Sequence, residues 1–379
     1  MSSNEPHRAQ TIALALLATV GVAAWVVMYW LGDRARLWQS LLVAFVYFSP
    51  LAGGLVVWSA VVNLSNGRWT GTMEKAALWG LGGWAVAIAL FVLLAALFVP
   101  SWASRCENPT WACWQSDRRA DAGKDFWLSS EFLFARNAAA LLAFWAVAAW
   151  YVRRRMRGLP ARGLATGVVL LYVLSMTLIG YDLVMSLDPV WFSSLLAPYV
   201  FISGMYTATA AWAIVAADSG LLEPTDRRHD LGKLIVTFSL LTMYMMYGQL
   251  LCIWYGNLPP ELRFVVPRLR HPPMQYVSLL LLGTVYLGPL VLMLPRWVKR
   301  RPAPLRLMAV WVLVFMYVER WWLIVPTFHQ GHDVISLPID LHAGDAAVAL
   351  AAVAGTALGI RHVRRAGPDH DVAEKGGAT

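Results

Sequence analysis

The chain has 379 residues and a formal net charge of +9, with 59% hydrophobic and only 14% charged residues. A soluble protein would carry about 25% charged residues, whereas here apolar runs of about 20 residues, long enough to cross a bilayer, recur throughout. This composition excludes a soluble protein and predicts an all-α polytopic membrane protein that forms one integral membrane domain. Because the basic residues lie in short loops, where they set topology, the positive charge does not indicate nucleic-acid binding.

Ten transmembrane spans are predicted, and Pro100, Pro160 and Pro295 mark helix ends. Their ranges are 11–31, 38–62, 74–99, 130–152, 163–185, 191–217, 231–255, 275–295, 306–325 and 341–361. The first is interpreted as a retained helix and not a signal peptide, because no small-residue cleavage site precedes the second. Residues 362–379 are expected to form a disordered cytoplasmic tail.

The Lys and Arg residues are distributed unequally between the two ends of the spans. Twenty of the 31 fall on the side of the N-terminus and nine on the opposite side, while Arg136 and Arg320 lie inside spans. Positive charge favours the cytoplasmic side. Both termini are therefore expected in the cytoplasm, and residues 101–129 and 326–340 outside.

One stretch, GYDLVMSLDPVWFSS at Gly180–Ser194, places the carboxylate of Asp182 about one turn inside a long apolar run. An ionisable residue at membrane depth costs about 3 kcal/mol on insertion scales and points to a functional site. Other unusual polar residues fall at the outer ends of further spans: Arg136, Asn137, Asp188, Gln249, Glu319, Arg320, His342 and Asp345. Since the inner ends show nothing comparable, we expect one outward-facing polar site.

These side chains allow more than one interpretation. Asp182 is either a proton-transfer group or headgroup acceptor, or a helix-end acid that reaches water or pairs with an arginine. Arg136 is always charged, so pairing with Glu319 or Asp182 competes with a ligand role. Glu319 and Arg320 project about 100° apart on one helix, so we expect each to find its partner elsewhere in the bundle. Gln249 is either interhelical packing or part of the site.

The sequence offers little for a metal or a haem. Only His342 of the eight histidines comes near a span, and a b-type haem needs axial histidines inside facing helices. No CxxC or CxxCH motif occurs, which excludes an iron–sulfur cluster or attached c-type haem. The loop residues His329, His332 and Asp333 are a weak metal candidate, and no metal is expected. Cys106 and Cys113 are either bridged or free thiols, and Cys252 is expected to be a small core residue.

Three stretches carry a resemblance to a known family. Gly180–Ser194 resembles the signature of the NrfD-like membrane subunits of alternative complex III, a bacterial quinol:cytochrome c oxidoreductase, and is most similar to the smaller, second quinone-binding subunit. Leu231–Leu234, with the helix end Gln249–Pro259, and Glu319–Pro326 resemble further family stretches. The similarity covers about residues 180–326. Val190 departs from it, because the family has a histidine there, and so do Pro260 after Pro259 and Arg320 beside the acid.

The resemblance implies ten helices, with two four-helix bundles and one peripheral helix at each end, and no redox centre of the chain's own. It implies a bacterial inner-membrane subunit whose partners are a multihaem cytochrome c, an iron–sulfur protein, a second NrfD-like subunit and membrane lipid, with no nucleic acid. Menaquinone or ubiquinone is the implied ligand, and no covalent cofactor is expected. Asp182 and Glu319 become candidate proton-transfer groups. The candidates for quinone binding or a charge network are Arg136, Asp188, Gln249, Arg320 and His342.

Two other functions stand beside a quinol-oxidising subunit. The first is a structural subunit whose polar residues serve only assembly. The second is a secondary transporter, against which we find no internal repeat and no Gly- or Pro-broken mid-span helices in matched halves.

Overall fold

The computed structural model describes residues 5–102, 126–188, 191–222, 225–329 and 339–367. This part of the chain is almost entirely helical and contains no strand. It includes ten helical segments that are long and apolar enough to cross a membrane. The prediction of an all-α polytopic membrane protein is therefore confirmed.

The first five spans run from Glu5 to Leu187. They are α1 (Glu5–Leu31), α2 (Arg34–Leu64), a composite third span of η1 (Arg68–Met73), α3 (Glu74–Leu78), η2 (Trp79–Gly83) and α4 (Trp84–Ala96), then α7 (Ser130–Met156), and α8 (Arg162–Ile179) with η4 (Gly180–Val184) and η5 (Met185–Leu187). A short helix, α5 (Phe98–Trp102), follows the third span.

The remaining spans run from Leu196 to Arg365. They are α9 (Leu196–Asp218), α10 (Thr225–Gly256), the eighth span of α12 (Met274–Leu281), η6 (Leu282–Leu287) and α13 (Gly288–Leu292), then α15 (Pro302–Ile324) with η7 (Val325–His329), and α16 (Ala343–Arg365). Two short helices lie between spans: α11 (Pro259–Leu269) before α12, and α14 (Arg296–Arg300) before α15.

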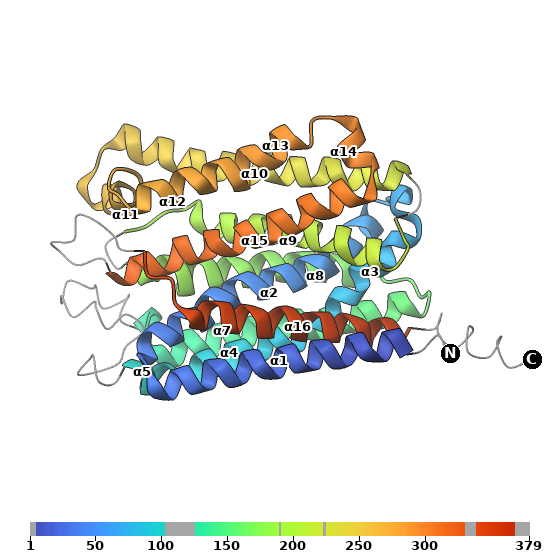
Figure 1. The fold of residues 1–379 in the computed structure, drawn as a ribbon, viewed down its shortest axis with the longest axis horizontal. Coiled ribbons are helices and arrows are strands. Elements are labelled where there is room, and N and C mark those ends of the chain that lie inside the picture. The colour runs from blue at the N-terminus through green and yellow to red at the C-terminus, as the bar shows by residue number, and fades with distance from the viewer. Residues whose placement is uncertain (1–4, 103–125, 189–190, 223–224, 330–338, 368–379) are drawn as a thin grey trace, which may run out of the picture.

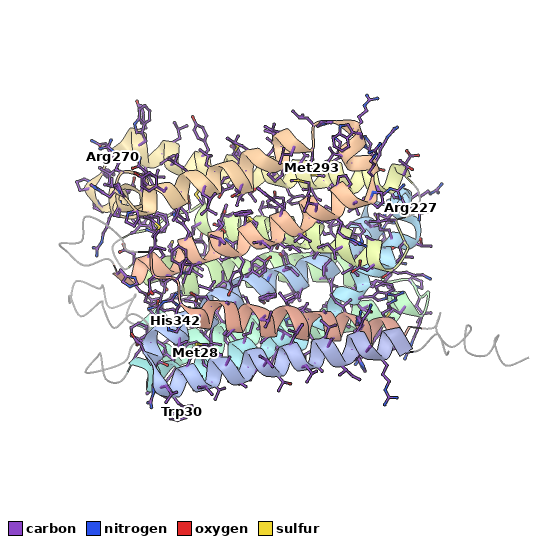
Figure 2. All side chains as sticks on the ribbon, in the orientation of Figure 1. Met28, Trp30, Arg227, Arg270, Met293 and His342 are labelled. Atoms are coloured by element: carbon purple, nitrogen blue, oxygen red, sulfur yellow. The ribbon has the colours of Figure 1, made fainter. Side chains whose placement is uncertain are left out.

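The second to fifth spans (α2, η1 to α4, α7 and α8) lie on one side of the molecule and form the first group, and the sixth to ninth (α9, α10, α12 to α13 and α15) lie on the other and form the second (Figure 1). Helix α2 packs against α4 and α8 within the first group and against α9 of the second, and it is buried along its whole apolar length. Helices α1 and α16 lie side by side along the first group. Alternating spans run in opposite directions, so Arg227 lies at one end of the molecule and Arg270, His342 and Trp30 at the other (Figure 2).

Small residues set the crossing of α2 with α9. A Cβ on Gly54 would lie 2.8 Å from the Ala208 Cβ, and one on Gly204 would lie 2.5 Å from the Pro50 Cβ. Without a hydrophobic driving force between helices in lipid, such close backbone approach supplies the van der Waals contact that holds helices together. Tyr172 of α8 adds a hydrogen bond to the Pro50 carbonyl at 3.0 Å, which ties a third helix to the same place.

Several predicted boundaries are wrong by a few residues or more. The sixth span begins at Leu196 and not at 191, because residues 191–195 are not helical. The seventh begins at Thr225 instead of 231, since a polar first helical turn precedes the apolar run. Helix α16 continues to Arg365, so the predicted tail at 362–379 begins later; residues 368–379 lie outside the described part.

The third span departs most from the prediction of a continuous helix over 74–99. Its backbone changes to a 3₁₀ helix at Trp79–Gly83, where three glycines remove side-chain bulk. The reason is tertiary: Gly82 and Gly359 of α16 touch through their backbones, and a Cβ on Gly359 would lie 1.9 Å from the Gly82 carbonyl oxygen. The eighth span also contains a π-helical segment, Leu282–Leu287.

The Gly82–Gly359 contact generates a stability prediction. Gly359→Ala is expected to lower the thermal unfolding temperature of the detergent-solubilised protein, because overpacking against a backbone costs about 1–3 kcal/mol. Gly163→Ala is the matched control: a Cβ there meets no atom within 4 Å. Equal unfolding temperatures for the two variants would contradict the close backbone contact.

Candidate functional site: buried polar clusters at one end of the spans

Asp182 lies in a π-helical turn at the end of α8. This turn, Gly180–Val184, continues the helix into a short 3₁₀ segment, and the Ser186 hydroxyl donates to the Asp182 carbonyl. Gly180 allows the turn to approach α9, since a Cβ there would lie 2.7 Å from the Ala197 Cα. The side chain of Asp182 is thereby buried, with 1% of its surface exposed.

The Asp182 carboxylate is surrounded by donors from α7 and the residues just before it. Asn137 Nδ2 donates to Oδ2 at 2.7 Å, and Arg136 donates from Nε at 3.0 Å with Nη2 at 2.7 Å from the same oxygen. Trp127 Nε1 donates to Oδ1 at 3.2 Å. The guanidinium also lies 3.8 Å from the Trp127 ring centroid and 4.7 Å from that of Phe132. Of the two partners foreseen for Arg136, Asp182 is the one it contacts.

Asp188 belongs to a second cluster, formed where α11 covers the end of the α8–α9 connection. Its carboxylate accepts from the Trp191 backbone at 3.3 Å and lies 3.5 Å from Arg263 Nε. The Trp191 ring stacks on Phe264 of α11 with centroids 4.3 Å apart. Val190, the departure from the family histidine, lies outside the described residues.

Arg268 completes this second cluster and was missed by the sequence analysis. It is fully buried: Nη1 donates to the Phe264 carbonyl at 2.9 Å and Nη2 to Thr327 Oγ1 at 2.8 Å. Burial lowers the pKa of Arg268 to about 9, while the negative charge of Asp188 acts in the opposite direction. A basic residue in a polar connecting segment gives no sequence signal of burial, because α11 folds back onto the bundle only in the tertiary structure.

Glu319 and Arg320 form a third cluster in the core of the second four-helix group. Arg320 Nη1 lies 2.8 Å from Glu319 Oε2, and both side chains are at most 2% exposed. The expectation that these neighbours do not pair is wrong. The Arg320 side chain is long enough to reach the carboxylate of its neighbour. Leaving either buried charge without a partner would cost several kcal/mol of folding free energy.

Two tyrosines and a serine extend the third cluster. Tyr199 donates to Glu319 Oε1 at 2.8 Å, and its hydroxyl lies 2.9 Å from that of Tyr286 in the π-helical segment η6. Arg320 Nη2 donates to Ser203 Oγ. Sequence reasoning missed both tyrosines, because a tyrosine inside an apolar span is equally compatible with a lipid-facing or a buried position.

His342 and Asp345 lie in a fourth cluster around Arg36 of α2. Arg36 donates to both carboxylate oxygens of Asp345 at 3.1 and 2.5 Å and to Asp340 Oδ2 at 2.6 Å. His342 caps α16: its Nδ1 accepts from Gly344 at 3.0 Å, and its backbone N–H donates to Asp345. These contacts give His342 the role of a helix cap and join the start of α16 to α2.

The expectation of one outward-facing site is therefore revised to four clusters. Among described residues, no hydrogen bond or ion pair joins the Asp182 cluster to the Glu319 cluster. Gln249 is buried on α10, and within the described part its side chain has no hydrogen bond to any cluster.

The opposite ends of the spans, which were expected to be the inner ends, also carry a buried polar contact. Glu74 accepts from Arg155 Nη2 at 2.6 Å and from Ser59 at 3.0 Å, and the Ser59 hydroxyl lies 2.9 Å from that of Tyr151. Glu74, the first residue of α3, thus also has hydrogen-bond partners from other helices, although Arg155 is 29% exposed.

The remaining predicted residues have simpler outcomes. The expectation that Cys252 is a core residue is wrong. Cys252 is exposed on α10, as is its neighbour Leu251. His332, Asp333, Cys106 and Cys113 lie outside the described residues. Within the described residues, no three His, Cys, Asp or Glu side chains are grouped so as to hold a metal ion, and His329 Nε2 lies 3.5 Å from Asp340 Oδ2.

No protein-family model matches the chain, and a search of curated proteins finds no match either.

The Glu319–Arg320 pair generates a second stability prediction. Glu319→Gln leaves the buried guanidinium without its counter-charge, which is expected to destabilise the protein by about 3–5 kcal/mol. Asp218→Asn is the control, since the Asp218–Arg306 pair also has a 2.7 Å contact but is 60% and 51% exposed; an exposed pair contributes about 1 kcal/mol or less. Thermal unfolding in detergent measures both, and an equal loss in the two variants would argue against a buried charge pair at Glu319.

Proposed function

We propose that the chain is an integral membrane subunit of a quinol-oxidising respiratory electron-transfer complex, similar to the second NrfD-like subunit of alternative complex III. The observation that carries this proposal is the buried Asp182 carboxylate. It lies within the stretch that resembles the family signature and receives donors from Asn137, Arg136 and Trp127. A buried acid with a basic partner at a span end is suited to exchange a proton with a bound quinol.

The chain's own acids define what it contributes. Asp182 and Glu319 would accept protons that leave an oxidised quinol, and each carboxylate lies beside an arginine. Asp188, Arg136, Gln249, Arg320 and His342 would flank the pocket or the proton path. Electron transfer would belong to partner subunits with haem and iron–sulfur groups, and the ligand would be menaquinone or ubiquinone. The complex would lie in a bacterial inner membrane, with both termini of this chain in the cytoplasm.

A structural role is the second candidate, and one observation favours it. Three of the four clusters tie different parts of the fold together: Asp182 joins η4 to α7, Asp188 joins the α8–α9 connection to α11, and Arg36 joins α2 to α16. Acids with this many partners would suit a role that only stabilises the helix bundle. A secondary transporter remains the least supported alternative, although the third span is interrupted at its glycines.

Asp182→Asn separates the two candidates. The amide oxygen can still accept from Asn137, and Arg136 keeps its contact with the Trp127 ring, so assembly is expected to remain intact. Loss of the exchangeable charge is expected to lower quinol oxidation several-fold or to change its pH dependence. Asp226→Asn, an exposed acid on α10, is the control and should behave as wild type. Wild-type turnover by Asp182→Asn at every pH would leave Asp182 a structural acid, whereas failure to assemble would favour the structural role.

Purification tests the partnership itself. The tagged chain, expressed alone, is expected to show no Soret band and no stoichiometric iron. The same tag in native membranes, extracted with a mild detergent, is expected to bring down a multihaem cytochrome c and an iron–sulfur protein that together oxidise quinol. One haem per chain in the protein expressed alone, or a natively extracted complex without quinol oxidation, would contradict the proposal.

A further inference from the structure

Basic side chains from two segments meet where α14 packs against the first turns of α10 (Figure 1). Gly232 makes this approach possible, because a Cβ there would lie 2.5 Å from the Lys299 Cγ. The Lys299 stem thus rests on the α10 backbone. Arg228 Nε donates to the Arg300 carbonyl at 2.8 Å, which holds α14 in this position.

The cations brought together here exceed the acids. They are Lys233 on α10 and Arg296, Lys299 and Arg300 on α14, and we call this set the α10–α14 basic cluster; His229 of α10 lies beside it. Asp230 lies 2.7 Å from Lys233. Within the described residues, the side chains of Arg296, Lys299 and Arg300 have no carboxylate partner. Lys299 Nζ instead donates to the Leu294 carbonyl at 3.4 Å.

His229 shows the same lack of a partner. Its Nδ1 is buried and makes no hydrogen bond to any described residue. The charged groups that face it are Lys233, Lys299, Arg300 and Asp230. Burial lowers the pKa of Lys299, and the positive charges of Lys233 and Arg296 lower it further. Such a concentration of like charge is unfavourable unless an anion joins it.

Two other basic residues at the same end of the molecule have acidic partners. Arg155 pairs with Glu74 at 2.6 Å, and Arg306 pairs with Asp218 at 2.7 Å. Between Glu261 and Glu319 the sequence contains no acidic residue at all. The cations of α14 therefore have no acidic residue near them in the sequence that could pair with them.

The neighbouring side chains indicate the depth of the cluster. Trp297 of α14 is 57% exposed, Leu294 just before it is 63% exposed, and Val298 is buried against the bundle. An exposed indole beside basic residues at the end of a span is typical of the headgroup level of a bilayer. At this depth, the basic cluster is within reach of the phosphate of a membrane lipid.

We propose that the α10–α14 basic cluster binds the phosphate group of an anionic membrane lipid. Basic pockets between transmembrane helices on the positively charged side of a protein are suited to such headgroups. The lipid phosphate would accept from Lys299, Arg296 and Arg300, and its acyl chains would lie along the exposed apolar faces of α10 and α13. The inference is independent of the proposed respiratory function.

The test titrates the purified full chain in detergent with short-chain phosphatidylglycerol and follows binding by thermal shift. Wild type is expected to be stabilised by phosphatidylglycerol and not by phosphatidylcholine of the same chain length. Arg296→Gln with Lys299→Gln removes two cations, each contributing about 1 kcal/mol near an anionic surface. The dissociation constant should rise about 30-fold, the equivalent of about 2 kcal/mol.

Arg153→Gln with Arg157→Gln is the matched control, because it removes two exposed cations from the same end of the molecule. This variant should keep the wild-type affinity. The charge-preserving exchange Arg296→Lys with Lys299→Arg should also bind, which separates charge from folding. An equal loss in both double Gln variants would reduce the effect to general surface charge and overturn the proposal. Stabilisation by inorganic phosphate alone, with none by phosphatidylglycerol, would overturn the lipid assignment.

Discussion

Every charge buried in this bundle must find a partner, because an unpaired charge in hydrocarbon costs more than the fold can recover elsewhere. This constraint explains the contacts of Arg136, Arg320 and Arg36, each of which lies against at least one carboxylate. In two of these three cases the partner comes from a different helical segment. The charge pairs consequently act as position-specific links between spans, in a medium where apolar packing alone distinguishes poorly between neighbours.

The same constraint shapes the irregular backbone. The π-helical turn at Gly180–Val184 presents Asp182 to α7, and the π segment at Leu282–Leu287 presents Tyr286 to Tyr199. Such single-turn distortions inside helices are frequent at functional sites. Here both coincide with buried polar clusters, so the local backbone and the polar contacts form one arrangement. The 3₁₀ segment at Trp79–Gly83 has a different cause, the backbone contact of Gly82 with Gly359.

The geometry of the four buried polar clusters is compatible both with proton transfer and with a purely structural role. The donors that surround a buried carboxylate could position it for proton exchange, and the same donors hold helices together. What distinguishes the two roles is exchange of the proton during turnover, which is a property of the working complex. The α14 cations of the α10–α14 basic cluster present the opposite situation, since Arg296, Lys299 and Arg300 have no carboxylate partner within the described residues and point to an anion from outside the chain.

Hydropathy and loop charge determined the class of fold, the number of spans and which ionisable residues lie inside apolar spans, because each is a local property of the chain. Asp182, Glu319 and Arg320 stood out for that reason. Only the tertiary structure decided which partners they take. Arg136 could have met either acid, Glu319 turned out to pair with its own neighbour, and Arg268 and Tyr199 gave no signal at all. Pairing depends on helix rotation and crossing, which contacts between distant segments set, such as Gly54 against Ala208.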